Sequence, residues 1–173
     1  AMFSTGVAFH FFTMMSIRNI DSDAAALILG FMAIPAFIMP FISKFVLHRF
    51  PVKRVLLTTL SMIIISMVFL MFGVSNAATA LLFILFYGLA IAIQILTTNL
   101  IWPTFFGRKH LGSIRGAATV FMVIGSALGP LPFGIVYDIT GKFNIAIIGM
   151  ILFTFIALLL SLFITKPIKP KKQ

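Results

Sequence analysis

The stretch VLLTTLSMIIISMVFLMFGV, residues 55–74, decides the fold class, because it is twenty residues long and carries no charge. An α-helix rises about 1.5 Å per residue, so such a stretch extends about 30 Å, the thickness of a bilayer's hydrocarbon core. In that core a helix satisfies its own backbone hydrogen bonds. The stretch therefore predicts a transmembrane helix.

The charges outside this stretch follow a regular order along the chain. Eleven of the 13 Lys and Arg residues lie in three clusters, at 44–54, 108–115 and 166–172. All three acids (Asp21, Asp23 and Asp138) lie in the other gaps. The only basic residues in those gaps are Arg18 and Lys142. Because Lys and Arg are enriched in cytoplasmic loops, alternate gaps face opposite sides of a membrane.

The apolar runs between the gaps predict an all-α transmembrane protein with six crossings. We expect spans at about 1–17, 24–42, 55–74, 78–105, 116–137 and 144–165, then a basic cytoplasmic tail at 166–173. Six is an even number, so both ends lie in the cytoplasm. The first run extends only about 25 Å as a helix, so we expect an incomplete crossing and a chain that begins inside a helix.

Composition argues against several other classes of protein. The chain is 61% hydrophobic and 9% charged, too apolar for a soluble domain of 173 residues. The net charge is +10, but the basic residues lie between apolar runs and do not form one basic surface. No nucleic-acid partner is therefore expected. There is no Cys or Glu, and no His has a partner four residues away. We therefore expect no metal, no cofactor and no enzymatic activity.

The long run 78–105 carries polar side chains on one broad helical face. Gln94 and Thr98 are one turn apart, and Asn99 follows directly. Because polar groups inside a membrane are candidates for function, this face predicts a substrate pathway. Hydrogen bonding between helices is the alternative.

Small residues and prolines distinguish the run 116–137. Gly125 and Gly129 form a GxxxG pair, followed by Pro130 and Gly134. Small residues let helices approach closely, and Pro bends a helix. The pattern predicts a helix interface or hinge, with a static packing contact as the alternative.

His10 lies among Phe residues in the first run. A buried, neutral His is able to accept a proton or bind an anion, which would suit proton-coupled transport. We count it among the pathway residues. A structural hydrogen bond to a neighbouring helix is the alternative.

Two stretches resemble a known family. WPTFFGRKHLGSIRG, residues 102–116, is similar to the cytoplasmic loop between helices ten and eleven of major facilitator superfamily transporters, closest to bacterial monocarboxylate and organic-anion members. GSALGPLPFGIVYDITG, residues 125–141, resembles helix eleven and its outer turn. The resemblance spans the whole chain, as helices seven to twelve.

This resemblance implies the C-terminal half of a secondary transporter in a bacterial inner membrane. It implies alternating access around a midplane site for a small solute, with an organic anion and a coupling proton as candidates. The partners would be the lipid bilayer and an N-terminal six-helix half, or a second copy. A half-size transporter acting as a homodimer, and a non-transporting subunit or gene remnant, are the alternatives.

The chain departs from the family pattern in two places. The loop after helix eight reads HRFPVKR, residues 48–54, so an Asp-based latch is not expected there. The runs 24–42 and 116–137 have no cation deep inside, so anion charge would be met by His10 or by the other half. Cytoplasmic gating or plain orientation explains the remaining basic residues, which are Arg49, Arg54, Arg108, Lys109 and Arg115.

Overall fold

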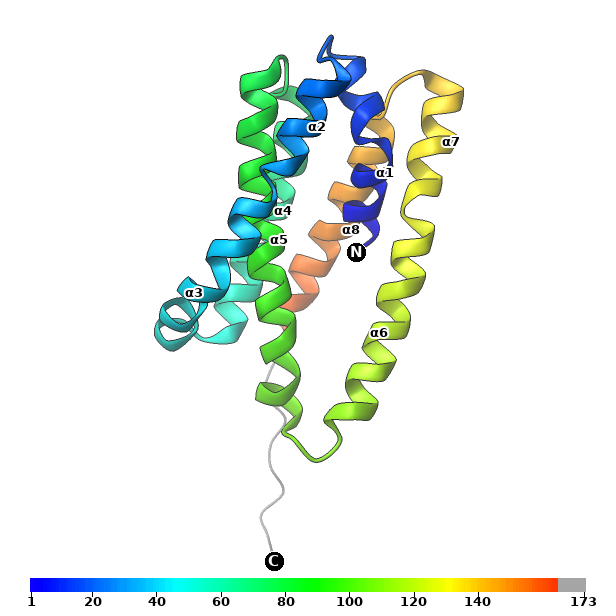
Figure 1. Cartoon of the computed structure of the whole chain (residues 1–173). Helices are drawn as coiled ribbons and strands as arrows, with labels where there is room; N and C mark the ends of the chain where they lie inside the picture. Colours follow the sequence, from blue (N-terminus) through cyan, green and yellow to red (C-terminus); the bar gives the residue numbers. More distant parts are fainter. Residues whose placement is uncertain (165–173) are drawn as a thin grey trace, which may run out of the picture.

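The computed structural model describes residues 1–164, without the side chains of residues 43, 44 and 46–48. All regular structure in this part of the chain is α-helical (Figure 1). The helices are α1 (Met2–Ser16), α2 (Ser22–Gly30), α3 (Ala33–Arg49), α4 (Val52–Phe72), α5 (Ala77–Phe106), α6 (Leu111–Leu128), α7 (Pro130–Thr140) and α8 (Asn144–Leu162).

Five stretches of the described residues are long and apolar enough to cross a membrane. They are α4, α5, α8 and two interrupted spans, Ser22–Ile42 and Leu111–Thr140. Helix α1 has 15 residues and is shorter than these. The predicted all-α transmembrane class is confirmed. The predicted tail at 166–173, and the last residue of the predicted span 144–165, lie outside the described residues.

The basic gaps are shorter than the sequence predicted. Helix α3 continues through Arg49, so the turn before α4 is confined to Phe50 and Pro51. Nothing breaks the helix earlier, and Pro51 restricts the residue before it. Helix α6 begins at Leu111, so the second basic loop covers only 107–110, and Arg115 is helical.

Prolines interrupt two of the spans. A Pro ring collides with the carbonyl four residues earlier in a helix, and Pro has no N–H to donate. The ring of Pro35 would collide with the carbonyl of Phe31, the residue that follows the end of α2. This span therefore breaks before the proline instead of bending at it. The ring of Pro132 would likewise collide with the carbonyl of Leu128, the last residue of α6. Helix α3, in contrast, passes through Pro40 unbroken.

Helix α4 packs between α5 and α8, and α3 packs on α5 (Figure 1). Helix α1 packs against α2, α6 and α7. Their shared interior is apolar and holds fully buried side chains from several helices, among them Phe11, Met67, Phe83 and Ile147. This core fixes α1 beside α5, which matters for the cavity between them.

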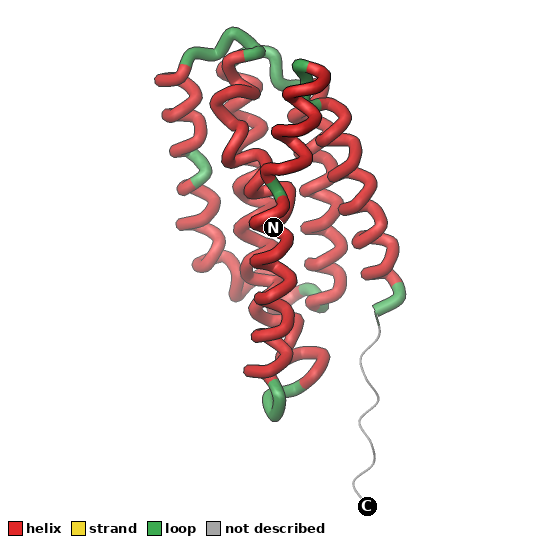
Figure 2. The backbone as a smooth tube through the Cα atoms, turned by 90° about the vertical axis from the view of Figure 1, so that its right-hand side faces the viewer, coloured by secondary structure: helices red, strands yellow, loops and turns green. Residues whose placement is uncertain are grey.

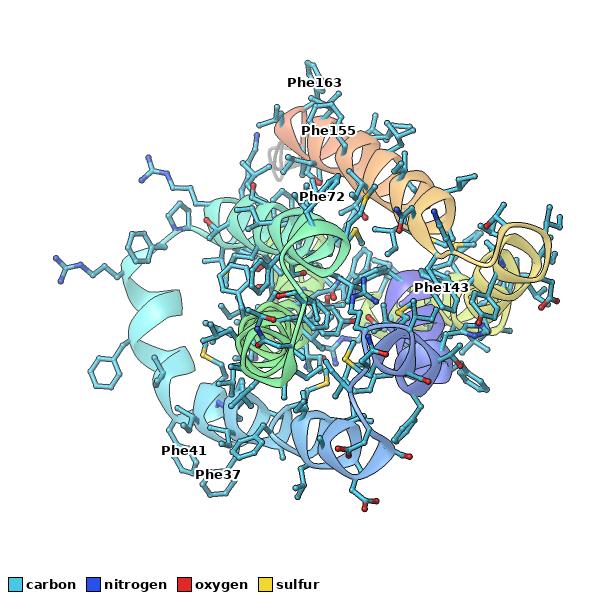
Figure 3. The ribbon with its side chains drawn as sticks, turned by 90° about the horizontal axis from the view of Figure 1, so that it is seen from above. Phe37, Phe41, Phe72, Phe143, Phe155 and Phe163 are labelled. Atoms are coloured by element: carbon cyan, nitrogen blue, oxygen red, sulfur yellow. The ribbon has the colours of Figure 1, made fainter. Side chains whose placement is uncertain are left out.

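Large apolar side chains also cover the outside of the bundle. Phe37 of α3 is 72% exposed and Phe163, after α8, is 80% exposed, and Figure 3 shows both pointing away from the helices. Phe41 points outward in the same view, and Phe72 and Phe155 are exposed as well. Phe143, by contrast, is 4% exposed and lies between α1 and α7. Such a surface suits lipid, which is as apolar as these side chains.

Apart from the breaks after α2 and α6, the connecting loops lie at the two ends of the bundle (Figures 1 and 2). Asp21 and Asp23 at the start of α2, and Asp138 near the end of α7, lie at one end, which we name the acidic end. The opposite, basic end carries the turn after α3 and the loop after α5. Asp21 Oδ1 accepts a hydrogen bond from the Ala24 N–H (2.7 Å) and caps α2, as expected of an Asp at this position.

One basic side chain ties helices together at each end. At the acidic end, the Arg18 guanidinium donates to the carbonyls of Met14, Leu70 and Val74, which close α1 and α4. At the basic end, Lys53 Nζ donates to the carbonyls of Leu162 and Ile164. Cations are favoured at helix C-termini, where the last carbonyls have no partner within the helix.

Candidate functional site

A large hollow of the described structure lies between α1, α5 and α6. It has a volume of about 710 Å³. Polar side chains from all three helices line it, including Ser4, Gln94, Thr98, Asn99, Trp102 and Arg115. A volume of this size, with a few polar groups on apolar walls, is typical of a small-molecule site.

Helix α5 supplies most of the polar wall. Gln94, Thr98 and Trp102 follow at intervals of four residues and therefore share one face of the helix. Asn76 begins this helix with a capping box, in which its side chain accepts from the Thr79 N–H (3.0 Å). The structure thus brings together three of the predicted pathway residues, Gln94, Thr98 and Asn99; their role in transport stays a prediction.

Arg115 supplies the charge of the cavity. Its Nη2 donates to the Asn99 carbonyl oxygen at 2.6 Å, which joins α6 to α5. The lining contains no Asp or Glu. The basic cluster predicted a loop at Arg115, whereas the structure places Arg115 in the second turn of α6.

His10 lies outside this cavity. Its Nε2 is 3.2 Å from the Pro130 carbonyl oxygen, and its ring stacks on Phe133 at 6.2 Å between centroids. Phe143 lies on another side, at 5.5 Å. A hydrogen bond to that carbonyl requires the proton on Nε2. This contact matches the structural alternative, and a role for His10 in the pathway remains a prediction.

The backbone of the glycine-rich span touches the backbone of α1 at Gly129. A Cβ atom on Gly129 would collide with Thr5 and with the Met2 carbonyl, so the two backbones touch. Gly6 faces the same contact from α1, where a Cβ would lie 3.0 Å from the Gly129 carbonyl oxygen.

The other members of the predicted interface differ in their surroundings. A Cβ on Gly134 would be 3.7 Å from the His10 ring, an ordinary contact, and Pro130 supplies the carbonyl that His10 meets. A Cβ on Gly125 would meet no described atom within 4 Å. The GxxxG pair is therefore used at one of its two glycines, and the partner glycine on α1 had no signal in the sequence beyond being a Gly.

The remaining basic residues lie at the basic end. Arg49, Arg54, Arg108 and Lys109 are exposed, and none lines the cavity. Their roles in orientation or gating stay predictions. The described residues include no cluster of three or more His, Cys, Asp or Glu side chains. The cavity thus offers hydroxyls, amides, an indole and a guanidinium, which are groups that bind a polar solute.

Comparison with known proteins adds a family to this geometry. A family model described as Major Facilitator Superfamily matches residues 1–173. No curated protein and no solved structure matches the chain. Because the match covers the whole chain, this protein belongs to the major facilitator superfamily of membrane transporters.

Proposed function

We propose that this chain is the C-terminal six-helix half of a secondary transporter that moves a small organic anion by alternating access. The observation that carries the proposal is Arg115, a cation on the wall of a cavity lined by no acid. The basic end would face the cytoplasm, by the positive-inside rule.

The chemistry of a guanidinium supports the anion. Arg stays charged at any physiological pH, and its planar fork matches a carboxylate. Arg115 is exposed and makes one hydrogen bond within the described structure, to the Asn99 carbonyl. Its other N–H groups are therefore available to a ligand. Hydrogen bonds between such charged groups are roughly twice as strong as neutral ones.

The contact between α1 and α7 supports alternating access. Bundles that rock against each other as rigid bodies need close packing within each bundle and a space that opens between the bundles. The Gly6–Gly129 contact supplies close packing near one end of the cavity wall, while α6 leaves the cavity open beyond it. A coupling proton remains part of the proposal, with His10 as its candidate carrier.

Two alternatives predict different products in the cell. A tagged protein more than twice the 19.1 kDa of this chain in isolated membranes would support one half of a two-half transporter. A product at this mass would support a homodimeric half-transporter or a non-transporting protein. Flux into liposomes would then separate those two.

The single Trp of the chain provides a direct test of the anion site. Trp102 lines the cavity, so quenching of its fluorescence in the purified protein reports which solutes enter. A unit charge about 6 Å away in water contributes about 0.7 kcal/mol, roughly threefold in local concentration. We expect Arg115→Gln to reduce quenching by iodide about threefold and to leave quenching by neutral acrylamide unchanged.

Arg54→Gln is the matched control, because Arg54 is an exposed Arg at the same end that does not line the cavity. It should leave both quenching constants unchanged. Sodium acetate should weaken iodide quenching of the wild type at constant ionic strength, whereas acetamide should not. Equal iodide quenching of Arg115→Gln and wild type would refute the anion site.

A further inference from the structure

Pro103 lies inside α5 and changes the hydrogen bonding of one carbonyl group of that helix. The helix runs from Ala77 to Phe106 through this proline without a break. A proline has no N–H, so the carbonyl four residues earlier, that of Asn99, loses its usual partner along the helix. Asn99 lines the large cavity between α1, α5 and α6. The proline therefore frees an acceptor at a residue of the cavity wall.

Arg115 takes the place of the missing donor. Its Nη2 donates to the Asn99 carbonyl oxygen at 2.6 Å, a short distance, as in other hydrogen bonds of charged groups. Inside a membrane, a carbonyl that a proline frees needs a new partner, which a neighbouring helix can supply. Here the partner comes from the second turn of α6. The proline and the arginine are thus complementary, because one removes a backbone donor and the other supplies a charged one.

A second proline of the chain meets the same problem in another way. Pro35 frees the carbonyl of Phe31, which accepts a hydrogen bond from the Ile34 N–H at 3.1 Å instead. That bond is local, and the span is divided there into α2 and α3. At Pro103 the helix continues, and the freed carbonyl binds a side chain of another helix. Of these two prolines, only Pro103 thus joins its helix to a charged group on another helix.

The chemical nature of this anchor matters for an anion site. A carboxylate would hold the guanidinium as well, but its negative charge would cancel the positive charge of the Arg. A backbone carbonyl is an uncharged acceptor, so it holds Arg115 and leaves the charge in place. No Asp or Glu is among the described residues that line the cavity. The contact therefore fixes a cation at the cavity without neutralising it.

We propose that Pro103 is a positioning residue for Arg115: it frees the Asn99 carbonyl as an uncharged anchor and so holds the guanidinium on the cavity wall. The proposal rests on the proposed function, in which Arg115 provides the charge for an organic anion. Pro103 is not among the residues that line the cavity, so it acts through Arg115. Arg115 is exposed, and an exposed Arg without an anchor would have to be ordered when an anion binds. The anchor reduces that cost.

The test measures the electrostatic potential of the cavity with two thiol reagents. The chain has no Cys, so Thr98→Cys, on the cavity wall next to Asn99, would carry its only thiol. The reagents are the anionic 2-sulfonatoethyl and the cationic 2-trimethylammonioethyl methanethiosulfonate. They are similar in size, so the ratio of their labelling rates in the purified protein reports charge and cancels changes in access. A unit charge about 6 Å away in water changes each rate about threefold, in opposite directions, and the ratio about tenfold.

We expect Arg115→Gln to lower the anionic-to-cationic ratio at Thr98→Cys about tenfold. Pro103→Ala restores an N–H that binds the Asn99 carbonyl along the helix and competes with Arg115. The ratio should then fall most of the way to that of Arg115→Gln. Pro103→Gly restores the same N–H and should have the same effect. Adding Pro103→Ala to Arg115→Gln should change the ratio no further, because Pro103 acts through Arg115.

Two matched controls accompany these variants. Pro40→Ala replaces a proline that also lies inside a helix, α3, but does not line the cavity. It should leave the ratio at Thr98→Cys unchanged. Ser75→Cys places an exposed thiol between α4 and α5, at the acidic end. Its ratio should be the same with and without Arg115→Gln.

The outcomes separate this proposal from the proposed function. If both Pro103 variants keep the wild-type ratio while Arg115→Gln lowers it, Pro103 does not position Arg115, and the proposed anion site stands. If Pro103→Ala lowers the ratio equally with and without Arg115, it acts by another route, and the proposal is likewise overturned. If Arg115→Gln itself leaves the ratio unchanged, the charge of the cavity and the role of Pro103 are both refuted.

Discussion

The two parts of the span Leu111–Thr140 differ in how they meet the rest of the bundle. At its middle, Gly129 and Phe133 are buried against α1. Helix α6, before that point, has no buried residue and forms one wall of the cavity. The difference shows that one apolar span contains a closely packed contact and a helix, α6, without buried side chains, with the proline break between them.

Glycine makes the fixed contact, and side chains make the cavity. At Gly129 and Gly6 the missing Cβ atoms let two helix backbones touch, which in a membrane is a main source of association. On α6, Arg115 reaches across to the Asn99 carbonyl and bridges a space that the backbones do not close. Substitutions at this contact should therefore lower the stability of the fold more than substitutions on α6.

The largest effect is expected from Gly129→Leu. The new side chain would collide with Thr5 and with the Met2 backbone, which cannot move aside as a flexible side chain would. We expect a loss of about 3 kcal/mol in the free energy of unfolding, at the upper end for overpacking, and loss of transport. Thermal unfolding of the purified protein, together with flux, measures both.

Gly125→Leu is the matched control in the same span. A Cβ there meets nothing within 4 Å among the described atoms, and Leu favours a helix over Gly. Its midpoint should equal or exceed that of wild type. If the two variants unfold at the same temperature, the contact at Gly129 is not the fixed point of this span.

The fold was predictable because two strong signals agree. Uncharged runs such as 55–74 have the length of a membrane crossing, and charge alternates between the gaps. Boundaries were less predictable. Lys and Arg mark a membrane surface without ending a helix, so α3 continues through Arg49 and α6 begins before Arg115. Pro35 broke its span four residues earlier than the proline itself.

The site was predictable only where its residues share one helix. Gln94, Thr98 and Asn99 follow from the period of α5, and the structure places all three on the cavity wall. Gly6 of α1 meets Gly129, a residue distant in sequence, and periodicity does not reveal such a contact. His10 was predicted to be a pathway residue because it is polar in an apolar run. The Pro130 carbonyl lies within hydrogen-bond distance of it, and its role in the pathway stays a prediction.

An intermediate loss of stability is expected at the acidic end, where the Arg18 side chain joins the C-terminal ends of α1 and α4. Arg18 Nη1 donates to the Met14 carbonyl at 2.7 Å and Nη2 to the Leu70 carbonyl at 2.8 Å. Burial lowers the pKa of this guanidinium, although Arg remains charged. Arg18→Ala should cost about 2 kcal/mol, as for charged hydrogen bonds. Thermal unfolding should show Arg18→Lys between Ala and wild type, and equal midpoints for Ala and wild type would contradict the clamp.

The smallest effect is expected at the basic end, where Lys53 ties α4 to the last turn of α8. Its Nζ donates to the Leu162 carbonyl at 2.6 Å and to the Ile164 carbonyl at 2.9 Å. A cation at a solvent-exposed helix end contributes about 0.5 kcal/mol, so Lys53→Ala should lower the midpoint only slightly. Hydrogen exchange should locate the change, with faster exchange at the amides of the last turn of α8. Arg54→Ala, next in sequence, should leave that turn unchanged, because the described structure records no bond from Arg54 to α8. If both variants accelerate exchange equally, the loss of a positive charge explains the change, and the Lys53 hydrogen bonds do not hold the end of α8.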